Sequence, residues 1–79
     1  MVTLRNIKRD GDIMEADYYP EAGADFGHIV INAKTGDIIE RIRPKNSDTS
    51  GMYSSHAKRR LIELWPREII PDESWTSWN

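Results

Sequence analysis

Two histidines and two neighbouring serines are the side chains that could support nucleophilic or acid–base catalysis. Ser54 and Ser55 directly precede His56, and some nucleophilic enzymes use a serine activated by a histidine. Neighbouring residues on a helix point in different directions, however, and the chain contains no Gly-x-Ser-x-Gly motif. His28 falls in a segment that alternates as a strand does, where we expect it on the surface. The sequence therefore assigns no catalytic residue, and we expect a protein that is not an enzyme.

A group of carboxylates could bind a hard cation such as Mg²⁺ or Ca²⁺. Their spacing does not match an EF-hand loop, and two of them alternate with apolar neighbours, which is typical of a solvated strand face. The chain also has no cysteine, no glycine-rich phosphate loop and no zinc-ligand spacing. We therefore predict neither a metal site nor a cofactor. The four acids are Asp10, Asp12, Glu15 and Asp17.

Basic side chains are concentrated between residues 41 and 60, although the whole chain has a net charge of -2. Such groups can neutralise nucleic-acid phosphates. Base-stacking aromatic residues are not interleaved with them, and the sequence pI of about 5.6 is low for a nucleic-acid-binding domain. Nucleic-acid binding is therefore the alternative hypothesis, and an acidic protein surface or a second copy of the chain would fit the same side chains. The basic residues concerned are Arg41, Arg43, Lys58, Arg59 and Arg60.

Apolar side chains that the predicted core does not use provide the other candidate surface. Some fall on the outer face of the predicted sheet, and two tryptophans stand near the C-terminal end, a residue type enriched at binding hot spots. Three interpretations stay open for the sheet face: the tail covers it, a partner or second copy packs on it, or it is exposed. The predicted interaction surface comprises Val30, Ile39, Arg41, Arg43, Trp75 and Trp78.

The elements that must position these side chains fit one domain of 79 residues. In the first strand, Leu4 and Ile7 fall out of phase, which indicates a bulge or an early end. Asp10-Gly11 is a hairpin signal, and Pro66 should end the only helix. We predict strands near 2–9, 13–19, 26–33 and 38–43, a helix near 52–65, and a short apolar tail over 66–79.

The predicted register of the third and fourth strands decides which side chains share a face. A four-residue loop over 34–37 places Ala33 opposite Ile38 and Ile29 opposite Ile42, so that these apolar residues face the helix. Arg41 and its neighbours of the same phase then lie on the other face. The expected fold is α+β: a four-stranded antiparallel meander with one C-terminal helix packed on one face.

The hydrophobic pattern bears on location as well as on fold. No apolar run exceeds four residues, and the first residues lack the apolar stretch of about 7 to 15 residues that a signal peptide needs. We therefore expect a cytoplasmic protein that does not enter a membrane. Its expected function is that of a small non-enzymatic interaction or regulatory module, which acts through the outer sheet face and the tail on a protein partner or a second copy.

Overall fold

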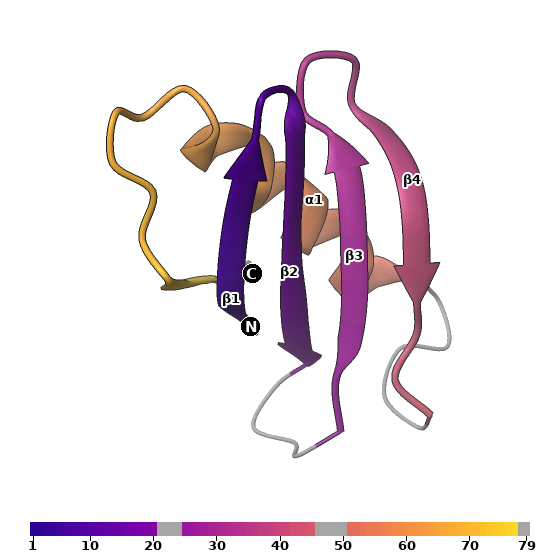
Figure 1. Ribbon diagram of the computed structural model, residues 1–79. Coiled ribbons are helices and arrows are strands. Elements are labelled where there is room, and N and C mark those ends of the chain that lie inside the picture. The colour runs from indigo at the N-terminus through magenta and orange to yellow at the C-terminus, as the bar shows by residue number, and fades with distance from the viewer. Residues whose placement is uncertain (21–24, 46–50, 78–79) are drawn as a thin grey trace.

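The fold is that of an α+β domain with one antiparallel sheet and one helix, as a computed structural model describes it for residues 1–20, 25–45 and 51–77. The strands lie in the order β4-β3-β2-β1-β5, and α1 crosses behind the sheet in the view of Figure 1. The elements are β1 (Val2–Asp10), β2 (Ile13–Pro20), β3 (Gly27–Asn32), β4 (Asp37–Ile42), α1 (Met52–Leu64) and β5 (Glu73–Thr76). The predicted architecture is confirmed, with a fifth strand added by the tail. No helix among the described residues is long and apolar enough to cross a lipid bilayer.

The core lies between the sheet and α1. Burial alternates along the whole of β2, because every second side chain points to α1. The helix contributes a stripe in which Ala57, Leu61 and Leu64 are fully buried, together with Ser54. Ser54 lies in the first turn of α1, and its neighbour Tyr53 is half-buried against the same core. The buried apolar residues of the sheet are Val2, Leu4, Ile7, Met14, Ala16, Tyr18, Ile29, Ile31 and Ala33.

A bulge in β1 explains why its apolar residues are out of phase. The pairing with β2 shifts between Arg5 and Lys8, and Asn6 adopts a left-handed backbone with φ of 57°. An asparagine tolerates this conformation better than most residues with a side chain. After the bulge, Ile7 again points into the core, so the predicted irregularity is confirmed.

The register of β3 with β4 differs from the prediction. We expected Ala33 opposite Ile38, but Ile38 lies opposite Ile31. Asn32 begins the loop earlier than predicted. Its side-chain oxygen accepts hydrogen bonds from the backbone amides of Lys34 and Thr35, at 3.0 and 3.1 Å. The backbone amide of Ala33 then donates to the carbonyl of Asp12 at 2.7 Å and does not pair with β4.

A second irregularity, in β4, inserts Ile39 as an extra residue. Ile38 still faces α1 with Ile31, but beyond the insertion Val30 lies opposite Glu40 and Ile29 opposite Arg41. Since Ile29 is buried against α1, Arg41 lies on the helix side of the sheet. The prediction that Arg41 projects from the outer face is therefore wrong, because a bulge moves the residues that follow it to the opposite face.

Two neighbours of Arg41 are also displaced from their expected faces. Ile42, predicted in the core, lies opposite His28 and is 58% exposed. Arg43, predicted on the outer face, reaches the start of α1, with its Nη2 atom 3.7 Å from where a Cβ on Gly51 would stand. The same shift of strand phase accounts for both corrections.

The tail adds β5 beside β1 at the edge of the sheet, and its described part, up to residue 77, does not lie across the outer face. Trp65 ends α1, and its indole Nε1 donates to the carbonyl of Gly11 at 2.9 Å. Arg9 then holds the turn after the helix by donating to the backbone carbonyls of Trp65, Arg67 and Glu68. These contacts direct the following residues back along β1.

Candidate functional site

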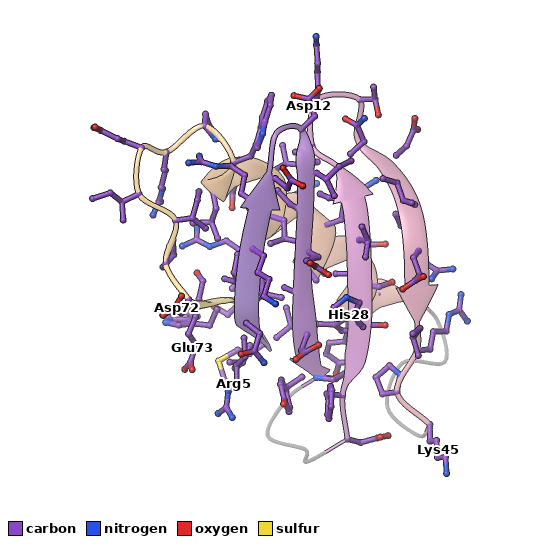
Figure 2. The ribbon with its side chains drawn as sticks, viewed as in Figure 1. Arg5, Asp12, His28, Lys45, Asp72 and Glu73 are labelled. Carbon is purple, nitrogen blue, oxygen red and sulfur yellow. The ribbon has the colours of Figure 1, made fainter. Side chains whose placement is uncertain are left out.

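The face of the sheet turned away from α1 is the strongest candidate for a functional surface. We call it the outer face, and Figure 2 views it from the front, with His28 in front of the sheet. No helix of the described chain lies over it, since the one described helix packs on the opposite side. The side chains that strand pairing places on it include Thr3, Arg5, Lys8, Glu15, Asp17, Tyr19, His28, Val30, Glu40, Ile42, Glu73 and Trp75.

Aromatic side chains form a row at one end of the outer face. Thr3 on β1 lies between Tyr19 on β2 and Trp75 on β5, its partners on either side. Phe26 stacks on Tyr19, with ring centroids 4.8 Å apart and planes inclined by 24°. Trp75 is 61% exposed and Phe26 48%. We call Trp75, Tyr19 and Phe26 the aromatic row.

A row of charged side chains runs next to the aromatic row. The strand pairings place Glu73, Arg5, Asp17 and His28 opposite one another in that order across β5, β1, β2 and β3. The Nε atom of Arg5 lies 3.6 Å from the Oε2 atom of Glu73, and its guanidinium carbon lies 4.9 Å from the centre of the Tyr19 ring. Arg5 therefore connects the two rows, and Figure 2 shows Arg5 and Glu73 close together near one end of β1.

His28 bridges two carboxylates of β2. Its Nδ1 atom lies 2.7 Å from Oδ1 of Asp17, the residue directly opposite, and its Nε2 atom lies 3.1 Å from Oε2 of Glu15. The second oxygen of Asp17 accepts a hydrogen bond of 2.8 Å from the side-chain amide of Asn6. The bulge in β1 thus has a visible consequence, because it aims Asn6 at the same carboxylate.

The proton equilibria of this bridge follow from its hydrogen bonds. The bond to the Asp17 carboxylate raises the pKa of His28; partial burial opposes the rise, and the bond to Glu15 and both negative charges add to it. For Asp17, partial burial raises the pKa, but the bonds from Asn6 and His28 and the charges of His28 and Lys8 outweigh it. The net shift of the pKa of Asp17 is downward.

The bridge is not arranged for metal binding or for proton abstraction. Among the described residues, no three His, Cys, Asp or Glu side chains form a group that could hold a metal ion. The two carboxylates sit at opposite nitrogens of the His28 ring, so they do not converge on one point. A general base needs a nitrogen that can accept a proton from its substrate, and while both carboxylates are bound neither nitrogen of His28 is available.

The structure separates the predicted interaction residues into three groups. Val30 and Trp75 lie on the outer face, Val30 half-buried between Glu15 and Glu40. Ile39 is the inserted residue of β4 at the sheet edge and is 57% exposed. The remaining three are elsewhere: Arg41 and Arg43 lie beside the start of α1, and Trp78 lies outside the described residues.

The predicted basic residues form two groups. Arg41 and Arg43 lie beside the start of α1, and Lys58, Arg59 and Arg60 lie within the helix. The Nη1 atom of Arg41 donates to the hydroxyl of Ser54 at 3.3 Å, beside the first turn of α1. Arg60, further along the helix, donates to the hydroxyl of Ser74 at 3.0 Å and contacts Glu63 at 3.4 Å. Lys58 is half-buried and Arg59 is exposed.

Neither the bridge nor the stacked rings were predicted from the sequence. Glu15 and Asp17 were interpreted as a solvated strand face and His28 as a surface residue, which describes their exposure but not their contacts. Period-two alternation in both strands could have placed all three on one face. Their register, and hence their contact, depended on the connection between β2 and β3, where Pro20 and Gly23 mark a loop but leave the pairing of the two strands open.

Comparisons of this chain with protein-family models, with curated proteins and with solved structures gave no match.

Proposed function

We propose that this protein is a small non-enzymatic interaction module that binds a partner protein through the outer face of its sheet. The observation that carries the proposal is the aromatic row, in which Trp75 is 61% exposed and Phe26, stacked on Tyr19, is 48% exposed. Large aromatic residues are enriched at binding hot spots, and an interface commonly surrounds such residues with polar groups. The charged row from Glu73 to His28 supplies polar groups of that kind.

The tail takes part in this surface because β5 presents Trp75. Pairing of β5 with β1 turns Trp75 to the outer face and Ser74 to the helix side, where Arg60 binds its hydroxyl. The backbone position of Trp75 is therefore set by strand pairing and by the contact of its neighbour Ser74. An aromatic side chain with only two rotatable bonds on a fixed backbone loses little entropy on binding.

The test compares two exposed apolar residues. Trp75→Ser removes a ring of the aromatic row, and Ile69→Ser is the matched control, because Ile69 is 82% exposed and lies outside the sheet. Tagged wild-type and variant proteins are used to recover partners from nuclease-treated host lysate, and the recovered partner is then titrated in purified form. We expect Trp75→Ser to weaken the affinity about 30-fold, the effect of a hot spot of about 2 kcal/mol, and Ile69→Ser to leave it unchanged. Equal affinities for all three proteins would exclude the aromatic row.

Self-association is an outcome of the same experiment. Sedimentation of the purified protein measures its mass, and a dimer that Trp75→Ser dissociates would make a second copy the partner. A monomer at all concentrations would leave a different protein as the partner.

Nucleic-acid binding is the alternative function. It is supported by Arg41 and Arg43, whose guanidinium groups lie together beside a helix that has no acidic residue in its first turn. Lys58, Arg59 and Arg60 would add phosphate contacts along α1. This function predicts an affinity that falls steeply between about 50 and 200 mM salt. Absent or salt-independent binding of single- and double-stranded DNA and RNA probes would exclude it.

The proposed site of action is the cytoplasm. A chain without cysteine is compatible with a reducing compartment, where disulfides are rare. Fractionation of host cells with an antibody to the protein tests this, and recovery outside the cytoplasmic fraction would contradict it.

A further inference from the structure

We propose that His28 is a proton-dependent clamp on the outer face: with both ring nitrogens protonated it holds Asp17 and Glu15 together, and when it loses one proton it releases Glu15. The clamp itself follows from the geometry of β2 and β3. Its consequence for partner binding rests on the proposed function of the outer face.

Two hydrogen bonds from His28 to ionised carboxylates require a proton on each ring nitrogen. A carboxylate only accepts hydrogen bonds, and both nitrogens of His28 face carboxylate oxygens, at 2.7 and 3.1 Å. A neutral imidazole has one N–H group, so it can satisfy only one of these acceptors. With both carboxylates ionised, only the imidazolium ion donates to both acceptors.

Two observations identify Glu15 as the carboxylate that is released. Asp17 lies directly opposite His28, has the shorter contact, and is also held by Asn6 at 2.8 Å. Glu15 lies diagonally from His28, with the longer contact, and its side chain is 38% exposed against 19% for Asp17. The remaining proton should therefore stay on Nδ1, where it faces Asp17.

The residues around the clamp come from the strands on both sides of it, and most of them are charged. On β1, Lys8 lies opposite Glu15, and Arg5 lies opposite Asp17. On β4, Ile42 lies opposite His28, and Glu40 flanks Val30 in the next row. The cations of β1 oppose protonation of His28, and the two carboxylates in contact with it favour protonation, so that contact decides the outcome.

Release of Glu15 changes the surface that a partner would meet. The imidazolium and the two carboxylates carry a net charge of -1, and loss of the proton makes it -2. The freed carboxylate stands beside Val30, its partner in the pairing of β2 with β3. A partner that fits the clamped face would meet one more negative charge and a mobile side chain at higher pH, and it would bind less tightly.

The raised pKa of His28 and the lowered pKa of Asp17 agree with this geometry. Both shifts mean that the charged forms of the two side chains stabilise each other. They place the loss of the His28 proton above the usual pH range for a histidine.

The first test reads the proton directly on the isolated protein. NMR spectra of ¹⁵N-labelled protein follow the His28 ring nitrogens through a pH titration, with His56→Gln to assign the two histidines. We expect Glu15→Gln to lower the pKa of His28. Glu40→Gln is the matched control, because it removes the same charge from the other side of Val30 without touching His28. Equal effects of the two variants would overturn the clamp.

The ring nitrogens also report which carboxylate is released. Above the pKa of His28, the ¹⁵N shifts should show the tautomer protonated on Nδ1. A ring protonated on Nε2 would mean that Asp17 and not Glu15 is released, and would overturn this part of the proposal.

The second test concerns regulation and requires a partner. Once a partner of the outer face is known, its affinity is measured across the pH range in which His28 titrates, for wild type and His28→Gln. We expect a fall in wild-type affinity with rising pH that His28→Gln lacks. Identical pH profiles would overturn the regulatory role. Failure to find a partner counts against the proposed function, whereas the NMR titration judges the clamp separately.

Discussion

The two faces of the sheet differ in how the same strands use their side chains. On the helix side, β1, β2 and β3 contribute fully buried apolar residues that pack on α1. On the outer face, the alternate residues of these strands form ion pairs, stacked rings and hydrogen bonds that water can reach. Burial of apolar area stabilises the fold, whereas half-exposed ion pairs contribute little. The helix side should therefore carry the stability, which leaves the outer face free for the proposed binding.

Removal of a core side chain should have the largest effect on stability. Leu61 is fully buried at the centre of the α1 stripe, so Leu61→Ala should lower the free energy of unfolding by about 2 to 5 kcal/mol. Val30→Ala, on the half-buried outer face, should cost about 1 kcal/mol or less. Urea denaturation followed by circular dichroism measures both. Similar losses in the two variants would mean that the faces do not differ as described.

Addition of a single methyl group at Gly27 should also be costly. A Cβ there would stand 2.7 Å from the Cε1 and Cζ atoms of the buried Tyr18 ring and against the backbone oxygen of Ile42. Gly27→Ala should therefore destabilise the protein by about 1 to 3 kcal/mol, since either the ring or β4 must move. Gly36→Ala is a useful comparison, because nothing lies near its Cβ but its φ of 82° is strained for alanine. A neutral Gly27→Ala would show that β4 yields easily.

The turn after α1 should depend on Arg9, which lies on the helix side opposite Met14. Arg9→Met keeps the aliphatic stem but removes the donors to the carbonyls of Trp65, Arg67 and Glu68. We expect a loss of about 1 kcal/mol in the free energy of unfolding and faster hydrogen exchange in β5. Arg59→Met, on the exposed side of α1, is the control. Unchanged exchange in β5 would mean that the tail is positioned without Arg9.

Local patterns in the sequence were enough to predict most of the fold. The Asp10-Gly11 turn, the alternation of β2 and the helical stripe ending before Pro66 each act over a few residues. The pairing of β4 could not be predicted, because Asn32 closes the loop through its side chain and Ile39 is inserted without a glycine or proline to mark it. That one error moved Arg41 and Ile42 to the wrong faces.

The candidate site was less predictable than the fold because it combines residues from separate strands. Strand phase alone predicted the face on which Val30 lies, whereas Trp75 was selected only as a tryptophan of the tail. The contact of His28 with Glu15 requires the register of β2 with β3, and the contact of Asn6 with Asp17 requires the bulge. The pairing of β5 with β1 also had no signal beyond the apolar character of the tail.

The stability contributed by His28 should be small and depend on pH. Because its pKa is raised in the folded state, its contribution is fully present below the unfolded pKa of about 6.5 and is lost as the pH rises through the folded value. The destabilisation caused by His28→Gln should therefore be larger at pH 6 than at pH 9, by less than about 1 kcal/mol for a site this exposed. Asp17 has a lowered pKa, so its contribution disappears only in acid, as the pH falls through its folded value. Urea denaturation at both pH values measures the difference, and a difference that grew toward pH 9 would contradict the assigned direction.

Trp75 should have the smallest effect on stability and the largest on binding. Its ring is mostly exposed, and the structure attaches β5 through backbone pairing with β1 and through Ser74, not through the tryptophan. Trp75→Ser should change the free energy of unfolding by less than about 0.5 kcal/mol, as surface substitutions usually do. A loss above about 2 kcal/mol would mean that the ring completes the fold, and the affinity lost in the same variant would then report unfolding. A stable variant that has lost its partner would show that the outer face keeps an aromatic side chain in water for binding.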